Sequence, residues 1–299
     1  MEKHTVSASL TDNTKYMNRA LPVKKSFDII ERTLIIGGQN SAFYFIDGFT
    51  KDEIMLKLMD SFLNISADDM PEDATSFSTS CIPYVEVDIL DDFDSIFKNL
   101  LSGVTCLFID GYEAAIAIDC RTYPSRSIEE PDKDKSLRGS RDGFVETIVF
   151  NTALMRRRIR DPHLIMEMYE AGTSTRTDIA LCYMSDRVDR ELLTTIQNKL
   201  EESKSQDLKM SQQSLAESSL SAQMVQIPFQ KYKFTERPDT ACACLMEGKV
   251  IILTDTSPSA LILPTSIFDM IEEANDYYFP PITGIYLKNI PCTDHTADC

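Results

Sequence analysis

The residues best suited to chemistry lie in an arginine- and glycine-rich segment near the middle of the chain. Gly139 and Gly143 free the backbone to turn tightly, and Asp142 stands where it can cap a helix that begins near Gly143. The amides of such a helix start, with Arg138 and Arg141 beside them, could hold an anion. A phosphate or a lipid headgroup fits this description.

A structural interpretation of the same segment is the alternative. Carboxylates at Glu129, Glu130 and Glu146 lie close in sequence to Arg138 and Arg141, and guanidinium groups pair well with carboxylates. Under this interpretation the two arginines clamp a turn and bind no ligand. Both interpretations remain open at the level of the sequence.

Arginine is also concentrated at the end of the helix that this segment leads into, after Asn151, at Arg156, Arg157, Arg158 and Arg160. Positive charge at a helix C-terminus complements the helix dipole, so a solvated, ion-paired helix end is the simpler interpretation. In a chain tethered to a membrane, the same charges could instead face anionic lipid.

A further charged motif, Thr-Glu-Arg-Pro-Asp, precedes a short predicted helix that starts near Pro238. Glu236 and Asp239 lie where a helix start favours negative charge, and proline is suited to the first helical turn. Arg237 can bridge to an acidic neighbour. The motif therefore predicts a structural corner.

Motifs of known catalytic or cofactor chemistry are absent from the sequence. It contains no nucleophile elbow, Walker loop, dinucleotide fingerprint or pair of metal-ligand histidines. Cys242 and Cys244 are separated by one residue, where a zinc knuckle needs two, and no histidine lies beside them. We interpret the pair as small buried residues on a helix, and we expect no enzyme activity, no cofactor and no metal.

Composition limits the partners and the compartment. The chain has 299 residues, 43% of them hydrophobic, with 30 Lys and Arg against 47 Asp and Glu, a formal charge of −17. Such a charge repels phosphate backbones and argues against nucleic-acid binding. No secretory signal precedes the eight cysteines, which indicates a reducing compartment, and no apolar run reaches the ~18 to 20 residues of a membrane span. We expect a soluble chain.

The elements that must position these residues follow from hydrophobic periodicity and turn signals. Expected strands lie at 27–36, 41–46, 83–90, 104–110, 113–119, 164–170, 178–184, 249–255 and 259–263. Expected helices lie at 52–63, 91–101, 143–160, 188–202, 239–246 and 264–278, and residues 64–80 read as a loop. The pattern is that of a mixed α/β fold.

The order of elements in the first half of the chain returns in the second. Strand, polar turn and helix at 42–55 match those at 180–193, and the Gly-strand-Asp block at 101–116 matches 246–261. Convergence of two apolar hairpins is the alternative, since hairpin turns reuse Asp and Gly for steric reasons. Duplication predicts two similar α/β subdomains with a cleft or hinge between them.

The domain prediction follows from the duplication and from a change in composition. We expect a disordered tail at 1–22 and a first subdomain at 23–120. A charged, proline- and serine-rich linker at 121–142 leads to a second subdomain at 143–290.

These stretches together resemble the A-subunit family of spore germination proteins. The resemblance is carried by Arg138-Gly-Ser-Arg-Asp-Gly-Phe-Val-Glu146, by Thr235-Glu-Arg-Pro-Asp239 and by Val250-Ile-Ile-Leu-Thr-Asp255, and it covers residues 25 to 290. Within the family, Phe45-Ile-Asp-Gly48 is most similar to the stage V sporulation branch.

The resemblance implies a non-enzymatic subunit of a membrane complex in the spore inner membrane. This region would lie on the cytoplasmic, spore-core side and would serve oligomerisation and signal transmission. Its partners would be other germination-complex subunits and further copies of itself. The alternative is a module that binds a nutrient or an anion in the cleft between the subdomains. At 291–299, a polar tail stands where the family continues into membrane helices.

Overall fold

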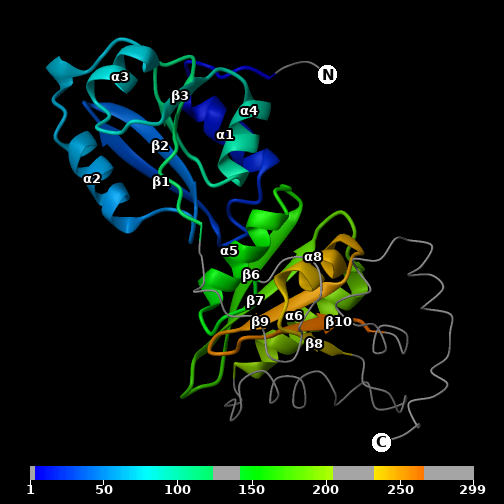
Figure 1. The fold of residues 1–299 in the computed structure, drawn as a ribbon. Coiled ribbons are helices and arrows are strands. Elements are labelled where there is room, and N and C mark those ends of the chain that lie inside the picture. Colours follow the sequence, from blue (N-terminus) through cyan, green and yellow to red (C-terminus); the bar gives the residue numbers. More distant parts are fainter. Residues whose placement is uncertain (1–3, 124–141, 205–231, 266–299) are drawn as a thin grey trace, which may run out of the picture. The chain divides into compact units, whose positions relative to one another are not determined.

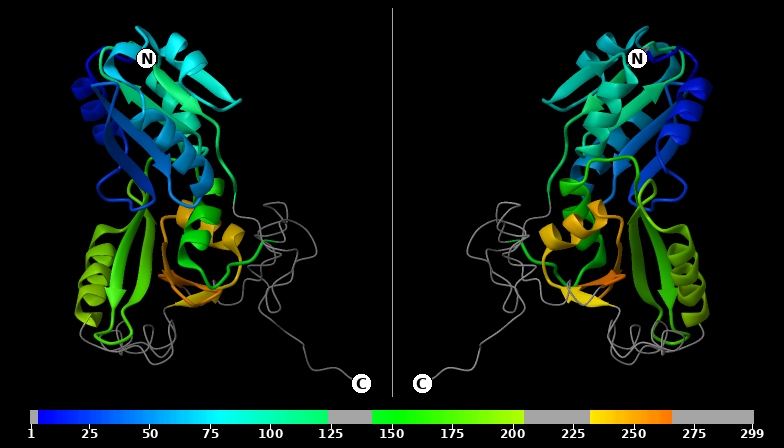
Figure 2. Two further views of the ribbon diagram at one scale, coloured as in Figure 1. Left: turned by 90° about the vertical axis from the view of Figure 1, so that its left-hand side faces the viewer. Right: turned by 90° about the vertical axis from the view of Figure 1, so that its right-hand side faces the viewer.

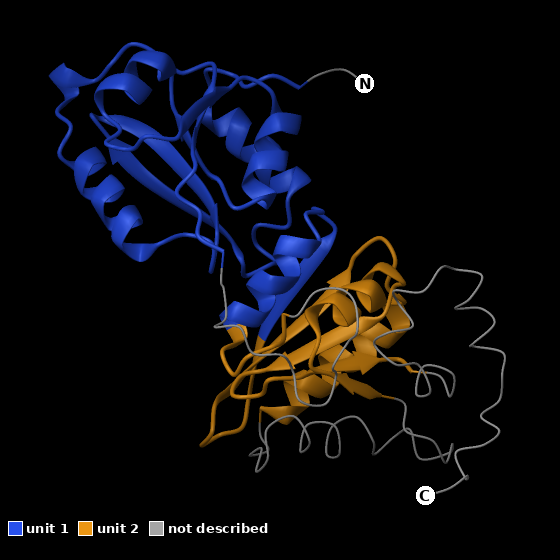
Figure 3. Cartoon of the chain, in the orientation of Figure 1, with its two compact units in different colours: residues 1–125, 149–168 blue, residues 126–148, 169–299 orange. Residues whose placement is uncertain are grey.

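The computed structural model describes residues 4–123, 142–204 and 232–265 (Figure 1). Contacts divide the chain into two compact units (Figure 3). Unit 1 comprises residues 1–125 and 149–168, and unit 2 comprises residues 126–148 and 169–299. Residues 149–168 thus group with the first unit, whereas the sequence places all of 143–290 in the second subdomain.

Unit 1 is built on a five-stranded antiparallel sheet with the order β1-β2-β4-β5-β3. Its strands are β1 (Ile29–Ile36), β2 (Gln39–Ile46), β3 (Val87–Leu90), β4 (Thr105–Ile109) and β5 (Ala115–Ile118). Its helices are α1 (Leu10–Ala20), α2 (Asp52–Leu63), the 3-10 turn η1 (Ala67–Asp69), α3 (Ala74–Ser80) and α4 (Phe93–Leu101).

Both faces of this sheet are covered, with α1 and α4 on one side and α2 and α3 on the other (Figure 1). Successive strand residues point to opposite faces, so Ala42 and Tyr44 enter the core under α1 and α4, while Phe43 enters the core under α2 and α3. Burying each large apolar side chain contributes about 1.5–3 kcal/mol. Both faces of β2 are therefore packed in a core.

The second sheet has the order β6-β7-β9-β10-β8. Its strands are β6 (Leu164–Ala171), β7 (Thr177–Met184), β8 (Lys233–Thr235), β9 (Val250–Thr254) and β10 (Ala260–Leu263). The helices of unit 2 are α6 (Arg190–Ser203) and α8 (Pro238–Met246), whereas α5 (Ile148–Arg158) belongs to unit 1 from residue 149 onward. Within unit 2, α6 and α8 lie on opposite sides of the strands (Figure 2).

The two sheets confirm the predicted duplication. Reading β6 for β1, β7 for β2, β9 for β4, β10 for β5 and β8 for β3 converts one strand order into the other. The hairpins predicted at 104–119 and 249–263 are the equivalent pairs β4-β5 and β9-β10, in separate sheets.

The prediction of a disordered tail at 1–22 is wrong for residues 10–20, which form helix α1. Ser9 caps the helix by accepting a hydrogen bond from the Asp12 backbone N–H (3.3 Å). Leu10 and Met17, seven residues apart, are buried against the sheet. The remaining helix surface is polar and few apolar residues mark the buried face, so the segment resembles a polar tail in sequence.

Two further boundaries differ from the sequence prediction. The expected loop at 64–80 contains α3, where Asp73 caps the helix and Phe77 is buried under the sheet. The helix expected from 143 begins at Ile148, because the preceding residues run extended and the Phe144 N–H donates to the Glu236 carbonyl (2.8 Å). The predicted helix at 264–278, most of the linker and the tail at 291–299 lie outside the described residues.

Candidate functional site

A carboxylate of the protein itself meets the start of helix α5. The Ile148 N–H donates to Asp255 Oδ1 (3.1 Å), and Asp255 lies in the turn between β9 and β10. Asp142, the expected cap, is exposed and lies six residues before the helix, so that prediction is wrong. The helix start therefore already has an acidic partner within unit 2.

Unit 1 repeats this arrangement at helix α1. The Leu10 N–H donates to Asp110 Oδ1 (2.9 Å), and Asp110 lies in the turn between β4 and β5. The next amide in each turn is bonded in the same way, from Gly111 to the Ala8 carbonyl and from Thr256 to the Glu146 carbonyl, both at 2.7 Å. The duplication thus extends to single hydrogen bonds.

A buried ion pair joins helix α5 to the beginning of β1 within unit 1. Arg156 Nε donates to Asp28 Oδ2 (2.7 Å), and the two side chains are 0% and 3% exposed. The remaining guanidinium hydrogens reach the Asp161 carbonyl (3.1 Å) and the Leu164 carbonyl (2.9 Å). The expectation of a solvated helix end is therefore wrong for Arg156, which fixes residues 149–168 to unit 1.

Ser26 completes this network. Its hydroxyl donates to Asp28 Oδ1 (2.5 Å) and accepts from the Met166 N–H (3.0 Å), and the Phe27 N–H donates to the Met166 carbonyl (3.0 Å). Each group in this network is a buried side chain or a backbone group. A buried charge must be paired and hydrogen-bonded to be tolerated. The network meets that condition.

Asp47 lies beside the same pair. Its backbone N–H donates to the Asp28 carbonyl (2.8 Å), and its carboxylate accepts from the Gly48 N–H (3.0 Å). Partial burial raises the pKa of Asp47, the Gly48 hydrogen bond opposes this rise, and the negative charges of Asp28 and Asp52 add to it.

The second charged motif forms a compact ion pair in unit 2. Arg237 is 0% exposed, and its guanidinium donates to both carboxylate oxygens of Asp239 (3.0 and 2.6 Å). Asp239 Oδ1 also accepts from the Thr240 N–H (2.9 Å) at the start of α8. Pro238 is buried at the first position of that helix.

The structure places the other motif residues as follows. Arg138, Gly139 and Arg141 lie outside the described residues. Gly143 and Asn151 are buried, whereas Glu146, Arg157, Arg158 and Arg160 are exposed and Glu236 is half-buried. The described motif residues therefore converge on two separate ion pairs and not on one open site.

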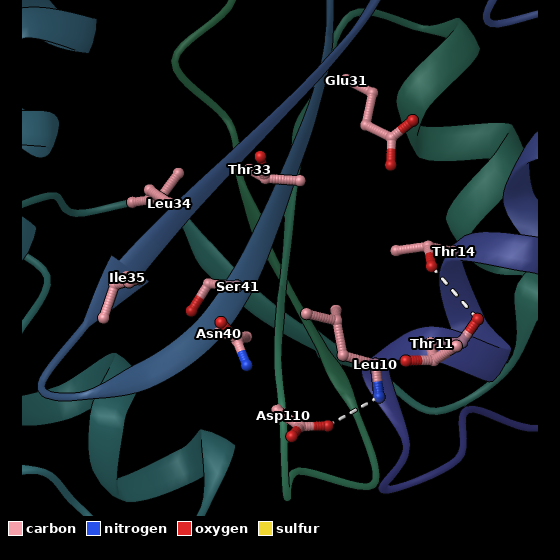
Figure 4. A pocket seen from close by; sticks show the side chains of 10 residues that line it. All are labelled: Leu10, Thr11, Thr14, Glu31, Thr33, Leu34, Ile35, Asn40, Ser41 and Asp110. Atoms are coloured by element: carbon pink, nitrogen blue, oxygen red, sulfur yellow. Dashed lines mark hydrogen bonds between the residues drawn. The ribbon is translucent and has the colours of Figure 1, made fainter.

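One cavity of about 570 Å³ lies in unit 1, between the start of α1 and strands β1 and β2 (Figure 4). Its polar lining includes Thr11, Thr14 and Glu31, and Asp110 stands at its lower end. Glu31 already accepts from Tyr44 Oη (3.0 Å), and burial together with the Glu31 charge raises the pKa of Tyr44. The cavity is hydroxyl-rich and its two carboxylates are engaged with the protein.

Sequence reasoning missed Asp28, Asp110 and Asp255 as the carboxylates that complete these sites. For Asp110 and Asp255 a signal existed, because the two aspartates align when the halves are set side by side. Cys242 and Cys244 are buried on α8, as predicted. Among the described residues, no group of three potential ligands could hold a metal ion, and no helix is long and apolar enough to cross a membrane.

The fold is that of a known class of protein domain. It matches the crystal structure of the N-terminal domain of the A subunit of the Bacillus megaterium spore germinant receptor GerK3, with a TM-score of 0.67 and 23% identity over 89% of this chain and 99% of that one. A family model described as Bacillus/Clostridium GerA spore germination protein matches residues 15–293. The chain belongs to this family.

Two relatives from Bacillus subtilis are similar in sequence to most of the chain. The chain is 33% identical to stage V sporulation protein AF over 96% of its own length and 58% of that protein. It is 29% identical to spore germination protein KA over 91% of its own length and 50% of that protein. The chain thus spans only about half of these relatives.

Proposed function

We propose that this chain is a non-enzymatic part of a subunit of a spore germination membrane complex, where it serves oligomerisation and signal transmission. Membership of the GerA family carries the proposal. The geometry supports it, because Arg156 and Arg237, the buried charged residues of the family motifs, are paired inside the protein and do not face an open site.

The complex would lie in the spore inner membrane, with this region on its core side. Other germination-complex subunits and further copies of the chain would be the partners. A unit whose buried charges are paired internally is suited to holding and passing on a change in geometry, because a packed unit moves as a whole.

Spore germination tests this function directly. Spores lacking the gene should germinate slowly, and the wild-type gene should restore the rate. Arg156→Ala should fail to restore it, whereas Arg158→Ala, at an exposed position two residues away, should succeed. Normal germination of the deletion strain would count against the proposal. So would affinity purification in which the Arg156→Ala variant recovers the other subunits in normal amounts.

Small-molecule binding is a second candidate, and the cavity in unit 1 favours it. Its hydroxyl groups and carboxylates suit a neutral polyol or an amino compound better than an anion. Calorimetric titration of the chain with sugars and amino acids tests it. Saturable binding that is lost in Thr33→Val and Thr14→Val would favour this candidate over a purely structural role.

A further inference from the structure

A group of arginines surrounds Tyr123 in unit 1 and includes Arg157 and Arg160 from the helix end discussed above. The guanidinium carbon of Arg157 lies 4.4 Å from the centre of the Tyr123 ring, and that of Arg121 lies 5.8 Å from it. Arg160 Nη2 and Arg121 Nη1 both lie 3.4 Å from Tyr123 Oη. We call Tyr123 and these three arginines the Tyr123 cluster.

The ring that gathers these arginines is itself fixed. Phe49, which is fully buried, packs edge-on against Tyr123 with ring centres 5.2 Å apart. Tyr123 Oη donates to the Ser102 carbonyl at the end of α4 (2.8 Å). The cluster therefore stands on the core of unit 1 and not on a free loop.

Positive charge in the cluster exceeds the negative charge that the described residues supply. Arg121 pairs with Asp119 (2.9 Å). Arg157 and Arg160 are exposed, and no described carboxylate lies within ion-pair distance of either. Three guanidinium groups thus face one carboxylate, in a chain whose formal charge is −17.

The end of helix α4 offsets only part of this charge. Arg160 Nη1 donates to Ser102 Oγ (3.2 Å), and Arg121 Nη1 lies 3.4 Å from the Ser102 carbonyl. A helix C-terminus carries about half a negative charge. Once Arg121 is paired with Asp119, two positive charges remain against about half a negative charge at the end of α4. The cluster therefore has an excess of positive charge that an anion could neutralise.

A phosphate group matches the deficit in charge and in shape. A phosphate monoester carries about −1.5 to −2 charges at pH 7 and three acceptor oxygens, and a lipid phosphodiester carries about one charge on two free oxygens. Guanidinium groups bind either in a planar, two-pronged geometry. The rigid tyrosine ring also orders Arg157 in advance, which lowers the entropy lost on binding.

We propose that the Tyr123 cluster is a binding site for a phosphate group, supplied either by an anionic phospholipid headgroup or by a small phosphorylated solute. Arg157 and Arg160 bind the phosphate oxygens, and Tyr123 positions Arg157. The site lies entirely within unit 1 and does not depend on the proposed role in germination.

Thermal stability in phosphate gives the first test, with the full chain. Inorganic phosphate should raise the melting temperature above that in sodium chloride of equal ionic strength. The Arg157→Gln/Arg160→Gln variant should lose this difference. Arg158→Gln should keep it, since that variant removes the same charge from the same helix end but leaves the cluster intact. Both substituted arginines are exposed, so the variants should fold.

Vesicle co-sedimentation distinguishes the two sources of phosphate. If the source is lipid, the chain should bind vesicles of equal parts phosphatidylglycerol and phosphatidylcholine, and not vesicles of phosphatidylcholine alone. An arginine near such a surface contributes about fivefold in affinity, so Arg157→Gln should weaken binding about fivefold and Arg158→Gln less than twofold. Stabilisation by phosphate without vesicle binding would identify a solute as the source.

Two results would overturn the proposal. One is that, at low salt, phosphate does not raise the melting temperature and the chain does not bind anionic vesicles. This is expected if the chain's own acidic residues at 129–134 already neutralise the cluster. The other is an equal loss of vesicle binding in Arg157→Gln and Arg158→Gln, which would indicate diffuse electrostatic attraction without a specific site.

Discussion

Asp110 and Asp255 occupy the same place in the two halves of the molecule. Each follows a buried strand, and each accepts the first backbone N–H of a helix, from Leu10 at 2.9 Å and from Ile148 at 3.1 Å. A carboxylate at a helix start satisfies an otherwise unpaired donor and complements the helix dipole.

Removing either aspartate should loosen the helix that it caps. Asp110→Ala and Asp255→Ala should each lower the free energy of unfolding by about 1 kcal/mol, the usual cost of a lost helix cap. Hydrogen exchange should speed up at the Leu10 amide in the first variant and at the Ile148 amide in the second. Asp68→Ala, at an exposed position, is the control. Unchanged exchange at both helix starts would show that the caps are dispensable.

The buried pair of Arg156 and Asp28 should be the more costly loss. Arg156→Ala leaves the Asp28 carboxylate buried without its partner, which typically costs about 3–5 kcal/mol. Arg158→Ala, at an exposed position on the same helix, should cost less than about 0.5 kcal/mol. Chemical denaturation of the two variants compares them. Equal stability would mean that Asp28 finds another partner or takes up a proton.

Local signals in the sequence predicted much of this fold. Helix α2 was expected at 52–63 and has those bounds, because its apolar residues repeat at helical spacing. The β4-β5 and β9-β10 hairpins were found because glycine and aspartate mark their turns. The equivalence of the halves followed from aligning these same local features.

Long-range pairing could not be predicted in this way. Asp28 and Arg156 are 128 residues apart, and the sequence around neither residue points to the other. An arginine at a helix end is normally solvated, so burial of Arg156 follows only from the fold that brings Asp28 to it. The Tyr123 cluster was missed for the same reason, since Arg121 and Arg160 meet only in three dimensions.

Asp47 should make stability depend on pH. Its pKa is raised in the folded state, so the folded chain holds this proton at pH values where the unfolded chain has released it. The stability that results is present below the ordinary pKa of aspartate and is lost as the pH rises through the raised value. Asp47→Asn should therefore stabilise the chain at pH 7 relative to wild type, and less so at pH 4.

Thermal melts at these two pH values measure the effect. Because Asp47 is only half-buried, solvent screening should limit the difference to on the order of a few tenths of a kcal/mol. Asp68→Asn controls for the loss of one exposed charge. A variant that is less stable than wild type at pH 7 would show that the Asp47 charge is favourable where it lies.

Two turn glycines should differ sharply in their tolerance of a side chain. Gly111 and Gly248 have backbone φ angles of +92° and +89°, which strain any L-residue by about 1 kcal/mol. A Cβ at Gly111 would meet no atom within 4 Å, whereas one at Gly248 would lie 2.7 Å from the Arg187 carbonyl oxygen. Thr256, the equivalent of Gly111 in unit 2, already tolerates a φ of +65°.

Gly111→Ala should therefore lower the melting temperature by about 2–4 °C, the shift that 1 kcal/mol produces in a chain of this size. Gly248→Ala adds a clash with backbone, which typically costs a further 1–3 kcal/mol or so, and should lower the melting temperature at least twice as far. Differential scanning calorimetry of the two variants compares them under one condition. Equal shifts would mean that the turn before β9 moves aside without cost, contrary to the close packing of Gly248 on Arg187.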